Sequence, residues 1–155
     1  MESKDIDHNA TIAFLKEIAL ICLAEGKEGL KKYLKDSRIG ERVRKALRAV
    51  MERRIIRAVL VNGGNIWFYN GKDSTHLIIP FKYCSCMDFL IHTVSKSMTP
   101  ACYHLIAQVI AETLNNYITL NLNRGEVISI INEINTRDLS ITLKRKIQEI
   151  RRSSQ

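Results

Sequence analysis

The chain has 155 residues, 46% of them hydrophobic and 26% charged, a balance that excludes disordered and fibrous proteins. A domain of this length buries enough surface to be stable without disulfide bonds, which excludes small disulfide-stapled proteins as well. Its 24 lysine and arginine residues against 16 aspartate and glutamate give a formal net charge of +8, which is typical of nucleic-acid binders but also occurs in basic proteins with other partners.

The chain begins with charged residues, among them Glu2, Lys4 and Asp5, where a secretory signal would need a basic start and then an apolar stretch. The sequence has no run of about 18 apolar residues. We therefore expect a protein that is neither secreted nor membrane-spanning. Its expected place is the cytoplasm, or the nucleoid if the source is prokaryotic.

The first segment is predicted to be helical. Apolar residues recur at steps of three and four from Ile12 to Leu23, which predicts a helix over about 9–25. Leu30 to Leu34 is predicted to form one or two helical turns, and a third helix runs from Gly40 into the mid-fifties. Most arginine and lysine residues of this third helix lie outside its apolar stripe, so one of its faces is basic.

Strands replace the helical period at Ile55. Residues 55–61 are rich in β-branched side chains and end at Asn62-Gly63-Gly64-Asn65, a strong hairpin signal. Further strands are expected at 66–69 and 75–81, on either side of a second turn at Asn70-Gly71. These strands predict a three-stranded antiparallel meander, closed by a segment that contains cysteines.

Helices are predicted again after Pro100, first over about 101–117 and then in an isoleucine-rich stretch that follows Gly125. Asp138 or Ser140 can cap a last helix. The fold class is therefore α+β, a small meander with a structural zinc site flanked by N- and C-terminal helices. The expected segments are a basic helical segment at 1–54, a zinc-binding module at 55–118 and C-terminal helices at 119–155.

Three of the four cysteines lie in one stretch with a histidine, in the pattern C-x-C-x15-C-x-H. The members of this pattern are Cys84, Cys86, Cys102 and His104. Three thiolates and an imidazole suit one tetrahedral zinc ion, and four protein ligands leave no open position, so the site is structural. Residues two apart share a side on a strand but diverge on a helix, so Cys102 is expected at or before a helix N-cap, with His104 in the first turn.

Two other interpretations of the cysteines stay open. Cysteines are commonly buried as small apolar side chains, which is what we expect of Cys22 on the apolar face of the first helix. A disulfide is the second alternative, and an intracellular chain disfavours it. The remaining histidines, His8, His76 and His92, are expected to have surface or packing roles.

Residues 57–112 resemble the SWIM zinc-finger family. The likeness consists of the strands, Cys84-Ser85-Cys86 followed by Asp88-Phe89, a spacer, and Cys102-Tyr103-His104 opening a helix that carries the small Ala107. Tyr103 stands where many members have lysine, which argues against phosphate contact by this loop itself. The resemblance implies a non-catalytic zinc module that binds DNA or protein. In size and motif the chain is most similar to small SWIM proteins, archaeal members included, that pair with recombinase paralogues in homologous recombination and DNA repair.

The motifs of two enzyme classes do not occur in the sequence. The H-x-E and P-C-x-x-C patterns of zinc deaminases are missing, as is the phosphate loop G-x-x-x-x-G-K-[ST]. We therefore expect neither catalysis nor a small-molecule substrate.

Positive charge is concentrated in the flanks, with a net +5 over residues 1–60, zero over 61–119 and +3 over 120–155. We expect sequence-nonspecific contact with DNA, chiefly through the basic helix after Gly40. The predicted contacts are Arg42, Arg44, Lys45, Arg48, Arg53, Arg54 and Arg57. The alternative is a solvated helix face that binds no DNA.

The late helices carry more isoleucine than a peripheral appendage needs. We therefore expect Ile131, Ile134 and Ile147 to bind a partner, either a recombinase-paralogue-like ATPase or a second copy of the chain. Packing of these helices on their own domain is the alternative. The alternative function is a protein–protein adaptor or a regulatory DNA-binding module without a role in recombination.

Overall fold

The computed structural model describes residues 8–154, so the charged start at 1–7, on which the expectation of an unsecreted protein rests, lies outside the described residues. The helices are α1 (His8–Glu25), the 3-10 helix η1 (Gly26–Lys35), α2 (Gly40–Met51), the π-helix η2 (Phe89–Ser95), α3 (Tyr103–Thr113), α4 (Arg124–Arg137) and α5 (Ile141–Ser153). The strands are β1 (Ile55–Leu60), β2 (Asn65–Asn70), β3 (Thr75–Ile79), β4 (Tyr83–Cys84) and β5 (Ile118–Leu122). The α+β class is confirmed, and the predicted helices and strands are present with boundaries shifted by a few residues.

The sheet is larger than the sequence predicted. Its five strands lie in the order β4-β3-β2-β1-β5, and β5 pairs parallel to β1, from Ile56 opposite Ile118 to Leu60 opposite Leu122. The expectation of a three-stranded antiparallel meander is therefore wrong in size and type, although β1, β2 and β3 do form an antiparallel meander within the mixed sheet. Strand β5 crosses the boundary expected between 118 and 119, so the last two predicted segments share one sheet.

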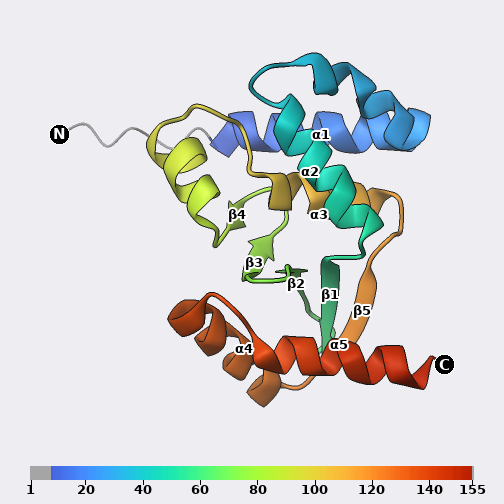
Figure 1. The fold of residues 1–155 in the computed structure, drawn as a ribbon, viewed down its shortest axis with the longest axis vertical. Helices are drawn as coiled ribbons and strands as arrows, with labels where there is room; N and C mark the ends of the chain where they lie inside the picture. Colours follow the sequence, from blue (N-terminus) through green and yellow to red (C-terminus); the bar gives the residue numbers. More distant parts are fainter. Residues whose placement is uncertain (1–7, 155) are drawn as a thin grey trace.

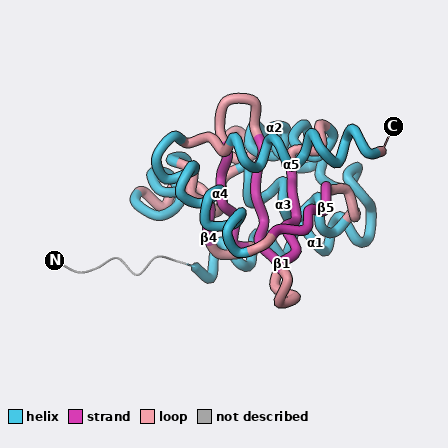
Figure 2. The backbone as a smooth tube through the Cα atoms, turned by 90° about the horizontal axis from the view of Figure 1, so that it is seen from below, coloured by secondary structure: helices cyan, strands magenta, loops and turns pink. Residues whose placement is uncertain are grey.

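Helices cover both faces of this sheet (Figure 1). Neighbouring residues of a strand point to opposite faces. Ile55 and Trp67 accordingly pack in a core with α1, α2 and α3, whereas Ile56 and Phe68 pack in a second core with α4 and α5. Figure 2, seen from below, shows α4 and α5 in front of the strands. The molecule thus has three layers, with a hydrophobic core on each side of the sheet.

Helix α3 lies in the interior of the first core. Every residue from His104 to Ala111 is buried. A helix that is buried on all sides needs apolar side chains all round, and Leu105, Ile106, Val109 and Ile110 provide them. Because α3 begins at the predicted metal ligands, its burial carries those ligands into the core.

The layer formed by α4 and α5 has well-defined ends. Asn123 caps α4 by accepting a hydrogen bond from the Glu126 N–H at 2.9 Å, and the Glu126 carboxylate accepts one from the Asn123 N–H at 2.9 Å. Ser140 caps α5, since its Oγ accepts a hydrogen bond from the Leu143 N–H at 3.0 Å. Asp138 instead ends α4, in the left-handed conformation with φ of 57°.

The isoleucines that were expected to bind a partner pack inside the chain. Ile134 and Ile147 are 5% and 2% exposed in the second core, and the partly buried Ile131 packs against that core. The expectation that Ile131, Ile134 and Ile147 form a surplus docking face is therefore wrong. It assumed that the other helices cover both faces of the sheet, but α1, α2 and α3 all lie on one face and leave the other to α4 and α5.

Within residues 8–154, no helix combines the length and the apolar character needed to cross a bilayer.

Candidate metal centre

The predicted ligands come from two segments that meet at the edge of the sheet. Cys84 ends β4 and lies opposite Ile78 of β3. Cys86 follows two residues later, Cys102 is the N-cap of α3, and His104 lies in the first turn of α3. These are the positions that the ligand spacing predicts for Cys102 and His104.

Ser85 holds the first pair of cysteines in place. Its N–H donates to the Leu77 carbonyl at 3.0 Å, and its Oγ accepts a hydrogen bond from the Leu77 N–H at 2.9 Å. These bonds extend the pairing of β4 with β3 by one residue. Since both bonds fix the residue between them, Cys84 and Cys86 have little freedom to separate.

The four ligand atoms form a compact group. The sulfur atoms of Cys84, Cys86 and Cys102 and a ring nitrogen of His104 all lie within 4.8 Å of one another, and all four residues are buried. Two sulfurs that bind one zinc ion at about 2.3 Å with tetrahedral angles are about 3.8 Å apart. The group is therefore close enough to hold a metal ion.

The thiols interact strongly with one another. Hydrogen bonds from Cys102 and then Cys84 hold the pKa of Cys86 far below its usual range. Hydrogen bonding to Cys102 and Cys86, together with burial, raises the pKa of Cys84, and burial raises the pKa of Cys102. Without a cation the group thus favours one thiolate over three, and a divalent cation would supply the charge that favours loss of the other two protons.

The ring nitrogens of His104 also support metal binding. Both of its ring nitrogens are buried and have no hydrogen-bond partner among residues 8–154. A buried polar atom left unpaired costs about 1–3 kcal/mol, and metal coordination through one nitrogen would remove part of that cost. The Phe89 N–H donates to Cys86 Sγ at 3.3 Å, a bond that further stabilises negative charge on this sulfur.

Two residues that the sequence did not mark as part of the site form its wall. The His76 ring on β3 lies 4.6 Å from the His104 ring, and the Tyr69 ring on β2 lies 4.3 Å from it. Burial and the neighbouring His104 lower the pKa of His76. His76 therefore has a packing role, against the metal centre itself, which only the β2–β3 register reveals.

The segment between the ligand pairs is tied to α2. Asp88 accepts hydrogen bonds from Arg42 Nη2 at 2.8 Å and from Arg42 Nε at 3.3 Å, and His92 Nδ1 lies 2.8 Å from the same carboxylate. Arg42 is thus a structural residue here, and its side chain is only 21% exposed.

The other predicted DNA contacts differ in whether their side chains already have partners within the described residues. The Arg44 guanidinium pairs with Glu41 at 2.7 Å, and Arg54 pairs with Glu52 at 3.1 Å. Arg53 donates to the Tyr117 carbonyl at 3.2 Å, and Arg57 is half-buried in β1. Lys45 and Arg48 are exposed and are in no ion pair within the described part of the chain.

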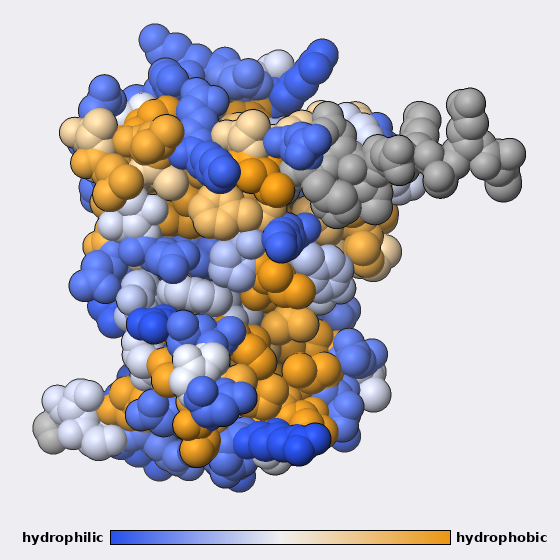
Figure 3. Space-filling model, turned by 180° about the vertical axis from the view of Figure 1, so that it is seen from behind, coloured by the Kyte–Doolittle hydropathy of each residue, from blue (hydrophilic) through white to orange (hydrophobic). Residues whose placement is uncertain are grey.

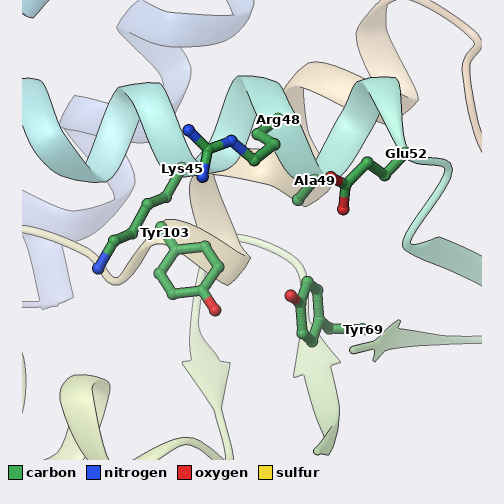
Figure 4. A pocket seen from close by; sticks show the side chains of 6 residues that line it. All are labelled: Lys45, Arg48, Ala49, Glu52, Tyr69 and Tyr103. Atoms are coloured by element: carbon green, nitrogen blue, oxygen red, sulfur yellow. The ribbon is translucent and has the colours of Figure 1, made fainter. Parts of the chain in front are cut away.

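Lys45 and Arg48 lie at an open pocket of about 230 Å³ between α2 and the metal centre (Figure 4). The residues that line it are Lys45, Arg48, Ala49, Glu52, Tyr69 and Tyr103. Tyr103 stands between the ligands Cys102 and His104 in the sequence, so the pocket shares a wall with the metal centre. The structure thus brings the basic helix and the cysteine loop together, which the charge pattern alone did not predict.

Comparison of the chain with protein-family models, with curated proteins and with solved structures found no match. The resemblance to the SWIM family therefore rests on the residues of the C-x-C-x15-C-x-H stretch and their surroundings.

Proposed function

We propose that this chain is a non-catalytic zinc-binding protein of the SWIM type that binds DNA, a protein partner, or both. The observation that carries the proposal is the closed ligand set, in which three cysteines and one histidine are buried within 4.8 Å of one another. A zinc ion held by four protein ligands has no open position for a substrate. Its role is to join β4, η2 and α3 into one module.

DNA binding is supported by charge and by its placement. The net charge is +8, and Lys45 and Arg48 are exposed on α2 without a carboxylate partner in the described residues. Contacts with phosphates release counterions and need no base-specific side chain, so binding should be independent of sequence. The SWIM resemblance suggests homologous recombination or DNA repair as the setting, with a recombinase-like ATPase as partner.

An adaptor function is the second candidate, and exposed apolar side chains on α1 favour it. Leu20 and Leu23 are 66% and 70% exposed and lie three residues apart, on one face of the helix. Figure 3 shows apolar side chains in the upper part of the rear face, at the level of α1, and again in its lower part. A protein partner would bind to such a face rather than to the buried Ile134 and Ile147.

Fluorescence anisotropy with labelled oligonucleotides of mixed sequence tests the DNA-binding function. We expect binding that weakens with salt, with a slope of log K against log salt of about −0.9 for each phosphate contacted on a duplex and about −0.7 on a single strand. A protein with full zinc content that binds neither form of DNA at low salt would overturn this part of the proposal.

Light scattering and a pull-down test the partner. We expect a dimer, or a complex with a recombinase paralogue, that Leu20→Ser with Leu23→Ser disrupts while zinc content is unchanged. A stable monomer that retains no recombinase paralogue would contradict the proposed partnership. DNA binding would then remain as the proposed function.

A further inference from the structure

The pocket between α2 and the metal centre has the side chains of an anion-binding site. Figure 4 shows Arg48 and Glu52 reaching over the pocket from α2, while Tyr69 and Tyr103 form its floor with their hydroxyl groups turned toward each other. Lys45 extends along its rim, with Nζ 5.9 Å from the centre of the Tyr103 ring. Arg48 thus lies over the pocket, while the Lys45 ammonium lies at its rim, on the opposite side of the Tyr103 ring from Tyr69.

The cations of this pocket differ from their neighbours on the same helix. Arg42 and Arg44 are engaged by Asp88 and Glu41 at 2.8 and 2.7 Å. Lys45 and Arg48, by contrast, are in no ion pair within residues 8–154. Since their charge is not offset by a bound carboxylate, an anion that enters the pocket finds two free positive groups.

Glu52 is the one acidic residue that lines the pocket, and it works against an anion. Its carboxylate is paired with Arg54 Nε at 3.1 Å, which offsets much of its charge. The lining side chains therefore keep a net positive charge. Removal of the Glu52 carboxylate tests whether the ligand is negatively charged.

The tyrosines are held rigidly. Tyr103 stands between two metal ligands, and its ring lies 3.9 Å from the ring of His104. The Tyr69 ring packs edge-on against the Tyr103 ring at 5.9 Å. Because the metal-ligand loop fixes this floor, the hydroxyl groups are positioned before a ligand arrives, which lowers the entropy cost of binding.

We propose that this pocket binds a phosphodiester group of a nucleic-acid backbone, with Arg48 and Lys45 supplying the charge and the hydrogen-bonded pair of Tyr69 and Tyr103 hydroxyls supplying a donor. The inference rests on the proposed DNA binding and names the place where it occurs. It also assigns to Tyr103 the phosphate contact that the absence of a lysine at this position had argued against. Arg44, Arg53 and Arg54, which have partners within the chain, are outside this contact.

Anisotropy titrations with a labelled single strand and with a duplex of the same length test the proposal. We expect Arg48→Gln and Lys45→Gln each to weaken binding about tenfold, as the loss of a charge-assisted contact predicts. The salt slope of each should fall by about 0.7 on a single strand or 0.9 on a duplex. Arg44→Gln is the matched control, because it removes the same charge from the neighbouring position and should change affinity by about twofold at most through the general field.

Two further substitutions test the chemistry of the pocket. Tyr103→Phe keeps the ring and removes the hydroxyl, so we expect weaker binding with one zinc ion still bound, and the zinc content reports that the variant is folded. Glu52→Gln removes the carboxylate that opposes an anion and should strengthen binding several-fold. Glu149→Gln, on α5 at the other side of the sheet, removes an equal charge and should leave affinity unchanged within about twofold.

The outcomes distinguish a failure of DNA binding itself from a failure of the pocket as its location. If the wild-type chain binds DNA but Arg48→Gln and Lys45→Gln match Arg44→Gln, or if Glu52→Gln weakens binding, the pocket is not the phosphate site and DNA is bound elsewhere. If the wild-type chain binds neither single strand nor duplex, DNA binding itself is wrong, and this inference falls with it. Comparison of the two DNA forms identifies whether the phosphodiester comes from a single strand or from a duplex.

Discussion

Replacement of Cys102 by serine removes one metal ligand while leaving a side chain of similar size. Structural zinc sites contribute about 10–16 kcal/mol to folding in small modules, or about 3 kcal/mol for each of four ligands. Cys102 is also completely buried, so a serine hydroxyl there costs about a further 1–3 kcal/mol. We therefore expect Cys102→Ser to lower the free energy of unfolding by about 4–6 kcal/mol with zinc present.

Cys22 provides the matched control, since it is 3% exposed in the same core but lies outside the ligand group. Cys22→Ser should cost only the burial of a hydroxyl, about 1–3 kcal/mol, whether zinc is present or not. The loss caused by Cys102→Ser should shrink to that range when a chelator removes the metal.

Urea denaturation followed by circular dichroism, once in a zinc buffer and once with chelator, measures both variants against the wild type. The decisive quantity is the zinc-dependent part of each loss, expected at about 3 kcal/mol for Cys102→Ser and near zero for Cys22→Ser. Equal losses for the two variants in both conditions would refute the role of Cys102 as a ligand.

Three more results are expected from the same measurement. Ile147→Ala should lower the free energy of unfolding by about 2–5 kcal/mol with zinc content unchanged, because Ile147 is buried in the second core. Asp88→Asn removes the acceptor of Arg42 and His92 and should cost about 1 kcal/mol, and an unchanged stability would show that this contact does not hold the loop. A hydrogen bond from Lys146, and a second from the Asn123 N–H, lower the pKa of Glu126 in the folded protein. The stability that this carboxylate adds is therefore present above its unfolded pKa of about 4.3 and is lost as pH falls through its folded pKa. The stability of Glu126→Gln should therefore approach that of the wild type as pH falls below about 4, and a gap that stays constant with pH would contradict this link.

The candidate metal centre could be predicted because its ligands are close together in the sequence. One residue separates the two ligands within each pair, Cys84 from Cys86 and Cys102 from His104. The geometry of a strand end and of a helix N-cap decides where the side chains of such pairs point. The N-cap position of Cys102 follows from that reasoning without knowledge of the fold. Its burial in the core follows equally from the apolar sequence of α3.

The sheet could not be predicted in full, because β5 depends on a contact between distant parts of the chain. Residues 118–122 alternate buried and exposed side chains, which is the pattern of a half-buried strand, but the segment is short and follows a predicted helix directly. Its parallel partner β1 lies about sixty residues earlier, and no local signal marks that pairing. The error about Ile134 and Ile147 has another cause: α1, α2 and α3 were expected on both faces of the sheet, and they pack on only one.

The pocket and the π-helix were missed for related reasons. Tyr69, Tyr103 and Arg48 come from β2, α3 and α2, so only the tertiary structure brings them together. The sequence of η2 predicts no helix, since a π-helix has a different period from the apolar repeat that identifies an α-helix.

X-ray absorption at the zinc edge of the purified chain tests the central claim most directly. With one zinc ion per chain, we expect three sulfur atoms at about 2.3 Å and one nitrogen atom at about 2.0–2.1 Å from the zinc. His104→Ala should remove the nitrogen, and Cys22→Ser should leave the shell unchanged. A chain that binds no zinc, or a shell dominated by oxygen and nitrogen, would contradict the assignment of Cys84, Cys86, Cys102 and His104 as a closed metal site.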